Sequence, residues 1–94
     1  MMNQNNFNNQ ENFATEKKNL TFEIKDGHKE AINIICDIRT KIKDALEIFS
    51  TRVGKNKEQF IFICNGSKLD YNDNRKIEQL SFGAPKILAI PKNN

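Results

Sequence analysis

A single stretch of this chain has the apolar spacing of an α-helix, and it lies between segments that have the spacing of β-strands. The apolar residues of the stretch recur at intervals that place them on one face of a helix, and they are Ile42, Ala45, Leu46, Phe49 and Val53. Gly54 follows, and glycine readily adopts the left-handed conformation that ends a helix. A domain made from this chain therefore has one helix with which to cover a sheet.

Two strands are predicted before the helix. Leu20–Ile24 alternates apolar and polar residues, which is the pattern of a strand buried on one side. Asp26 and Gly27 then favour a turn, because glycine accepts positive φ and aspartate bonds its own backbone. A second alternating run, Glu30–Cys36, follows the turn. Two alternating runs around a glycine turn predict a β-hairpin.

Further strands are predicted after the helix. Phe60–Cys64 is an apolar run of strand length, and the Asn-Gly pair after it is a strong turn signal that leads into a brief strand at Ser67–Leu69. Lys86–Ile90 forms a last strand, which ends at Pro91 because proline has no N–H to donate. This order predicts an α+β fold, with one helix packed on one face of a mixed four- to five-stranded sheet. The first and last strands are expected to be parallel neighbours at the sheet centre.

The N-terminal end differs in composition from the rest of the 94 residues. Residues 1–19 contain seven Asn and two Gln, and their large apolar side chains other than the leading methionines are Phe7 and Phe13. Such a segment buries too little surface to offset the conformational entropy of ordering it. We therefore expect a disordered tail over residues 1–19 and one folded domain over residues 20–92. A domain of this length makes a deep catalytic cleft unexpected.

The charge balance is mild. Lys and Arg number 15 and Asp and Glu number 12, so the formal net charge is +3. A nucleic-acid binder usually carries a denser basic stripe with interleaved aromatic residues, so no nucleic-acid partner is expected. No apolar run reaches the roughly 18 residues of a membrane span, and the N-terminus lacks the apolar segment of a secretory signal. The expected location is cytoplasmic or nuclear.

The sequence offers few groups for catalysis or metal binding. His28 is the single histidine and has no Cys or His beside it. Cys36 and Cys64 lie on predicted strands with the spacing of core residues, and as buried thiols they fit a reducing compartment. The chain has no glycine-rich phosphate loop and no metal-ligand spacing. We therefore expect no enzyme activity, no cofactor and no small-molecule substrate.

In this order and spacing the elements resemble the ubiquitin-like β-grasp family, over Leu20 to about Pro91. The segments that carry the resemblance are Leu20-x-Phe22-x-Ile24, Ile32-x-Ile34-x-Cys36, Ile42-x-x-Ala45-x-x-x-Phe49, Phe60-Ile-Phe62-Ile-Cys64-Asn-Gly66-x-x-Leu69, Ile77-x-x-Leu80-x-Phe82 and the final strand. The Gly-x-x-Leu turn after an apolar strand is the most specific of them. The resemblance implies a ubiquitin-like domain over residues 20–92 that works by binding proteins.

The end of the chain departs from the conjugated members of that family, which end in a diglycine. Here no glycine follows Gly83, and the chain ends in Pro91-Lys-Asn-Asn. The resemblance therefore implies the non-conjugated type, a stand-alone adaptor or a subunit of a larger assembly. One alternative is a small-GTPase-binding, Ras-binding-like module, for which Arg39, Lys41 and Lys43 near the helix start supply positive charge. A conjugated modifier is a further alternative.

The outer face of the sheet, opposite the helix, is the expected site for a protein partner. Successive side chains of a strand point to opposite faces, so Ile61 and Ile63 point outward if the other residues of their strand face the helix. The same alternation places Ile35 outward. On the last strand either Ile87 and Ala89 or Leu88 and Ile90 join this face. The resemblance matches Ile63 to a recognition position of ubiquitin and leaves Ala89 or Pro91 for another. The candidate partner-binding residues are Ile61, Ile63, Ile35 and Ala89.

Overall fold

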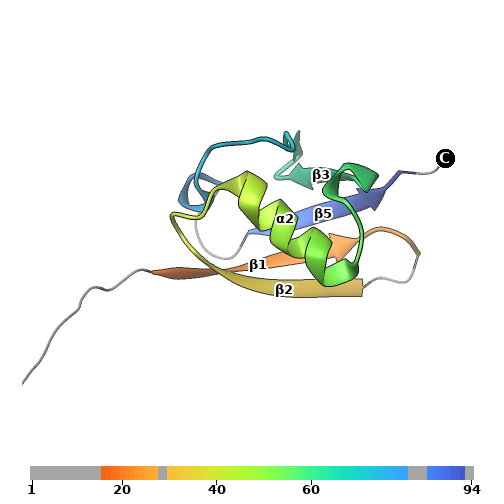
Figure 1. Ribbon diagram of the computed structural model, residues 1–94, viewed down its shortest axis with the longest axis horizontal. Helices are drawn as coiled ribbons and strands as arrows, with labels where there is room; N and C mark the ends of the chain where they lie inside the picture. Colours follow the sequence, from red (N-terminus) through yellow and green to blue (C-terminus); the bar gives the residue numbers. More distant parts are fainter. Residues whose placement is uncertain (1–15, 28–29, 81–84, 93–94) are drawn as a thin grey trace, which may run out of the picture.

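The computed structural model describes residues 16–27, 30–80 and 85–92, and Figure 1 shows one helix lying across one face of a sheet. The elements are β1 (Lys17–Ile24), β2 (Glu30–Asp37), α2 (Ile42–Val53), β3 (Phe60–Cys64), β4 (Ser67–Lys68) and β5 (Lys86–Pro91), with short 3₁₀ helices η2 (Lys57–Gln59) and η3 (Ile77–Gln79). The strands are arranged in the order β2-β1-β5-β3-β4. The predicted α+β fold, a mixed sheet with one helix on one face, is confirmed.

The two strands at the sheet centre come from opposite ends of the domain. β1 pairs antiparallel with β2 and parallel with β5, as predicted, and β5 pairs antiparallel with β3. β1 begins at Lys17, three residues before the expected start at Leu20. It is longer because backbone pairing needs no apolar side chain: Lys17 lies opposite Asp37, and Ile38 donates its N–H to the carbonyl of Glu16 at 3.0 Å. The rest of the predicted tail, residues 1–15, lies outside the described residues.

Helix α2 starts and ends on backbone contacts. The N–H groups of Ile42 and Lys43 donate to the carbonyls of Arg75 and Asp73, at 2.8 and 3.0 Å, so the loop after β4 caps the first turn. At the other end Gly54 adopts φ 74°, and its N–H donates to the carbonyl of Thr51. A left-handed glycine at this position is the usual helix stop. The helix therefore has the bounds that its sequence pattern indicates.

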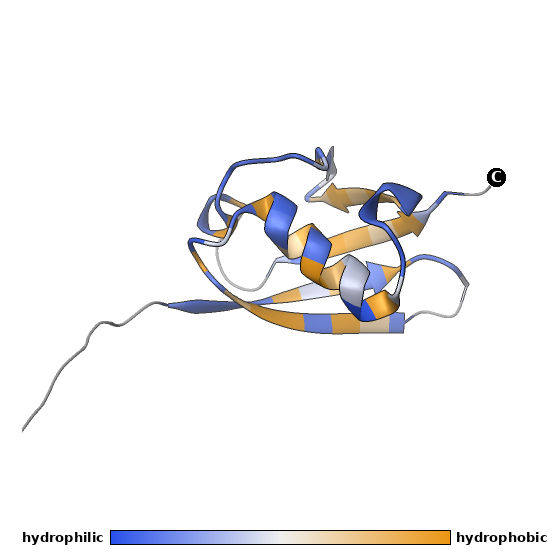
Figure 2. Ribbon diagram, in the orientation of Figure 1, coloured by the Kyte–Doolittle hydropathy of each residue, from blue (hydrophilic) through white to orange (hydrophobic). Residues whose placement is uncertain are grey.

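Aromatic rings fill the space between the helix and the sheet. Phe49 of α2 stacks on Phe22 at a centroid distance of 4.5 Å and meets Phe60 and Phe62 edge-on at 5.3 and 5.7 Å. Figure 2 shows β3 and β5 as largely hydrophobic ribbons, whereas the loop after β4 is hydrophilic. Tyr71 in that loop donates its hydroxyl to the carbonyl of Phe60. The core thus fixes which face of each strand is turned away from the helix.

Candidate functional site

The third strand presents isoleucines to the outer face of the sheet. Phe60, Phe62 and Cys64 are buried against the helix side, and the residues between them are half-buried on the opposite face. These residues are Ile61 and Ile63, so the structure places both where the alternation predicts them. A role of either in binding stays a prediction.

The last strand corrects one candidate. Ala89 is 0% exposed, so it faces the helix and is not available on the outer face. Its register explains this: Ala89 lies beside Ile24 on β1 and opposite Phe62 on β3, and residues side by side in a sheet share a face. Leu88 and Ile90 are half-buried and take the outer positions. The prediction that Ala89 faces outward is wrong. The segment Ile-Leu-Ala-Ile is apolar throughout, so the alternation of apolar and polar residues cannot show which side chains face the helix.

The four outward residues form two cross-strand pairs. Ile61 on β3 lies opposite Ile90 on β5, and Ile63 lies opposite Leu88. Directly opposed side chains of antiparallel strands have Cβ atoms about 4.5–5.5 Å apart, so each pair is in contact range. We call Ile61, Ile63, Leu88 and Ile90 the outer patch. A sequence-based argument finds all four only when the register of β5 against β3 is known.

Charged residues border the outer patch on both sides. On β1, Glu23 lies beside Leu88 and pairs with Lys25 at 3.7 Å between Oε1 and Nζ. On β4, exposed Lys68 lies opposite Ile63. Exposed Lys86 precedes the patch on β5. An apolar centre with a polar rim is the usual composition of a protein-docking surface.

Ile35 is not part of the outer patch. It points to the outer face, as expected, and its side chain is 72% exposed. It lies on β2, opposite Asn19 of β1, and β1 separates it from β5. The outer-face residues of β1 are polar, so Ile35 stands apart from the patch as a single apolar side chain. The structure therefore brings together two of the four sequence-based candidates and separates the other two from them.

The described residues provide little for catalysis. Within them no group of three or more His, Cys, Asp or Glu residues could hold a metal ion. Burial raises the pKa of the Cys36 and Cys64 thiols, which favours the unreactive protonated form. A hydrogen bond from Arg75, at 2.7 Å from Nη2 to Oδ2, lowers the pKa of Asp73, and this pair lies in the loop that caps α2. None of these groups belongs to the outer patch.

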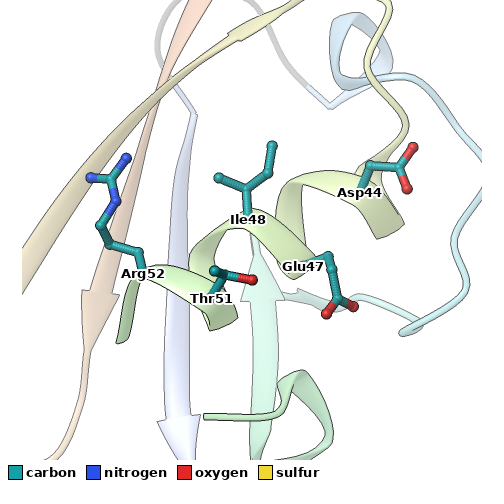
Figure 3. Close-up of a pocket in the computed structure, with 5 residues that line it drawn as sticks. All are labelled: Asp44, Glu47, Ile48, Thr51 and Arg52. Atoms are coloured by element: carbon teal, nitrogen blue, oxygen red, sulfur yellow. The ribbon is translucent and has the colours of Figure 1, made fainter. Parts of the chain in front are cut away.

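One surface hollow lies on the helix. It has a volume of about 460 Å³ and is lined by Asp44, Glu47, Ile48, Thr51 and Arg52 (Figure 3). Ile48 is 41% exposed and has charged side chains around it. Glu47 of this lining pairs with Lys57, at 3.5 Å between Oε1 and Nζ, and the largely buried Lys57 ammonium also donates to the carbonyl of Tyr71. In the part of the chain described, no helix has the length and apolar character needed to span a membrane.

Solved structures that share this fold include a ubiquitin and a ubiquitin-like domain. Ubiquitin of Caldiarchaeum subterraneum aligns with a TM-score of 0.73 at 10% identity, over 84% of this chain and 98% of that one. A ubiquitin-like domain of Arabidopsis thaliana aligns with a TM-score of 0.72 at 11% identity, over 93% of this chain and 89% of the other. A chain of the pParkin–pUb–UbcH7 complex aligns with a TM-score of 0.65 at 18% identity, over 81% of this chain and 23% of its own length.

Neither protein-family models nor curated proteins match this sequence. The structural likeness shows the fold, so the predicted ubiquitin-like β-grasp fold is confirmed.

Proposed function

We propose that this chain, which has the ubiquitin-like β-grasp fold, is a non-covalent protein-interaction module that docks a partner through the outer patch. It would act as an adaptor or as a subunit of a larger assembly, without catalysing a reaction. The observation that carries the proposal is the pairing of Ile61 with Ile90 and of Ile63 with Leu88 on the face away from the helix. These four apolar side chains are half-buried, and within the described residues no second helix layer covers them.

Burial of the outer patch would be favourable. Removing apolar surface from water contributes about 25 cal/mol per Å² to binding. The two cross-strand pairs are adjacent, so one partner surface can cover all four side chains. Glu23, Lys68 and Lys86 around the patch can fix the orientation of a partner through charge. The likeness to ubiquitin-like domains supports protein binding, although fold alone does not define a function. The two unpaired buried cysteines accord with a cytoplasmic or nuclear location.

No observation favours the small-GTPase-binding alternative over this reading. Such a module would use positive charge on its second strand and at the helix start, and the charged residues of β2 are the acidic Glu30 and Asp37. Arg39 beyond the strand is held by Asp37, at 3.7 Å from Nε to Oδ1. A comparison of binding to GTP-loaded and GDP-loaded GTPases decides this alternative, because an effector prefers the GTP form.

The proposal is tested by capture of partners with matched variants. Three tagged proteins are purified from the cells that express them: the parent chain, the double variant Ile61→Asp/Ile63→Asp and the control Asn19→Asp/Asn33→Asp. The proteins bound to each are identified by mass spectrometry. The control adds the same two carboxylates to the same sheet face at exposed polar positions away from the patch. We expect the principal partner to bind the parent and the control and to be lost from the Ile variant, with all three folded by circular dichroism. Equal retention by all three would move the site to another surface.

A further inference from the structure

Among residues 16–27, 30–80 and 85–92, nothing pairs with the outer edge of strand β2. β2 is the outermost strand in the order β2-β1-β5-β3-β4, and in the described part of the chain it pairs with β1 on its other side.

The direction in which the backbone N–H and C=O groups of β2 point follows from the hydrogen bonds of the neighbouring strand β1. Thr21 donates its N–H to Pro85 on the β5 side, so odd-numbered residues of β1 bond toward β5 and even-numbered ones toward β2. Their partners on β2 are also even-numbered, and Ile38 accordingly donates its N–H to Glu16. Ala31, Asn33 and Ile35 therefore direct their N–H and C=O groups to the open edge.

The central part of this strand lacks the residues that usually prevent strand addition. Natural edge strands carry lysine, proline or a bulge, or are very short. β2 has eight residues, with no Lys, Pro or Gly among them, and its pairing with β1 is continuous over its whole length. Its charges are confined to the ends, at Glu30 and Asp37. The six residues between them are Ala31, Ile32, Asn33, Ile34, Ile35 and Cys36.

Two exposed apolar side chains lie beside this edge, one on each side of the sheet. Ile35 is 72% exposed on the outer face of β2. Ile48 is 41% exposed on α2, and in Figure 3 it extends with Arg52 from the flank of the helix toward β2. Arg52 also lines a second hollow together with Glu30 and Ile32, which places this flank next to the strand. Among the described residues these two are the large apolar side chains that are exposed.

We propose that β2 pairs with β2 of a second copy of this chain, antiparallel, with Asn33 opposite Asn33 of the second copy. The two sheets then join into one continuous sheet about a two-fold axis. In this register the open N–H and C=O groups of Ala31, Asn33 and Ile35 meet those of Ile35, Asn33 and Ala31 of the second copy. Each of these pairs exchanges two backbone hydrogen bonds, because odd-numbered residues point to the edge in both copies.

The side chains in this register suit a second copy. On the outer face Ile35 of each copy lies opposite Ala31 of the other. The two-fold axis therefore produces two contacts in which an exposed isoleucine covers a small apolar residue. The side-chain carbonyl of Asn33 already accepts a hydrogen bond from Thr21 at 2.9 Å, and its amide nitrogen can donate to Asn33 of the second copy. On the helix side Ile32 lies opposite Ile34 of the second copy. Glu30 lies opposite a cysteine, so no two carboxylates face each other across the ladder.

The edge of β2 is complementary to itself, which favours a second copy of the chain as its partner. A two-fold interface requires that one surface match itself, and a strand with a central asparagine and apolar residues on either side of it does so. The contact is separate from the outer patch, since β1 lies between β2 and β5. A partner on the outer patch and a second copy on β2 can therefore bind at the same time.

Sedimentation equilibrium of the full 94-residue chain tests the proposal. From about 20 μM to about 1 mM, a range that reaches weak millimolar interactions, we expect the mean mass to rise from 10.9 kDa toward twice that value. Ile35→Lys places a charge at the ladder and should remain monomeric throughout. Ile63→Lys is the matched control, an identical substitution on the same face but on β3, and it should associate like the parent.

Amide exchange at the two ends of this concentration range locates the contact. The N–H groups of Ala31, Asn33 and Ile35 should become protected only at the high concentration, whereas that of Ile34, which bonds to β1, should be protected at both. A mean mass that remains 10.9 kDa at about 1 mM contradicts the proposal. This holds even if β2 pairs with a strand of another protein. The proposal is also overturned if Ile63→Lys abolishes association and Ile35→Lys does not, since the outer patch would then hold the two copies together.

Discussion

Phe49 on α2 and Phe22 on β1 stack face to face, with centroids 4.5 Å apart and ring planes 15° apart. This contact joins the helix to a central strand, and both side chains are fully buried. Phe49→Ala should lower the free energy of unfolding by about 3–5 kcal/mol, the usual cost of removing a buried aromatic ring. Chemical denaturation measures the effect. Ile48→Ala on the exposed side of the same helix is the control, with an expected change of about 0.5 kcal/mol. Equal midpoints for the two variants would show that Phe49 is not a core residue.

Gly54 ends α2 in the left-handed conformation, at φ 74°. A Cβ atom added there meets no other atom within 4 Å, so the cost of substitution comes from the backbone alone. Gly54→Ala should therefore destabilise the protein by about 1–2 kcal/mol, the left-handed penalty for a residue with a side chain. Thermal denaturation measures the effect. Lys55→Ala, at the exposed position that follows, is the control and should change the melting temperature little. A Gly54→Ala variant as stable as the parent would argue that the helix ends elsewhere.

The hydrogen bonds from Arg75 hold the pKa of Asp73 below its ordinary value of 3.8. Because this folded-state pKa is depressed, the contribution of the pair to stability is present above the unfolded value and is lost as the pH falls through the folded one. Carbon-detected NMR titration of the Asp73 carboxyl should show its midpoint below 3.8, and Arg75→Gln should raise it. Arg39→Gln is the control, since Arg39 pairs with Asp37 instead. An unchanged midpoint in Arg75→Gln would contradict the assigned cause.

Burial raises the pKa of both thiols, at Cys36 and Cys64. The thiolate is the reactive form, so both cysteines should react slowly with a thiol reagent in the native protein near neutral pH. Both should react rapidly after unfolding in denaturant. β2 and β3 are separated by two strands, so air oxidation should not form an intramolecular disulfide. A thiol that reacts at the unfolded rate in the native state would place that cysteine at the surface.

The sequence predicts most of the fold because the helical and strand periods are separated cleanly along the chain. The spacing of Ile42 and Phe49 and the glycine at 54 define α2, and the alternation of Leu20–Ile24 defines the buried face of β1. The start of β1 at Lys17 could not be predicted, because its first residues are held by backbone bonds to β2 and carry polar side chains.

The candidate site was predictable only in part. Ile61 and Ile63 follow from the large aromatic residues that alternate with them on β3. Leu88 and Ile90 do not follow from β5 alone, since a wholly apolar run gives no facing signal and ladder register depends on distant partners. The sequence leaves two choices for the outer residues of this strand, and the candidate Ala89 is buried on the helix side.

The central claim is that the outer patch docks a protein partner. It is tested most directly by the dissociation constant between the captured partner and the double variant Ile63→Asp/Leu88→Asp. These two residues lie opposite each other at the centre of the outer patch, one found from the sequence and one from the register. Isothermal titration calorimetry should show binding at least about 30-fold weaker than that of the parent, which corresponds to a loss of about 2 kcal/mol at an interface hot spot. An affinity equal to that of the parent, in a variant with an unaltered circular dichroism spectrum, would contradict docking through the outer patch.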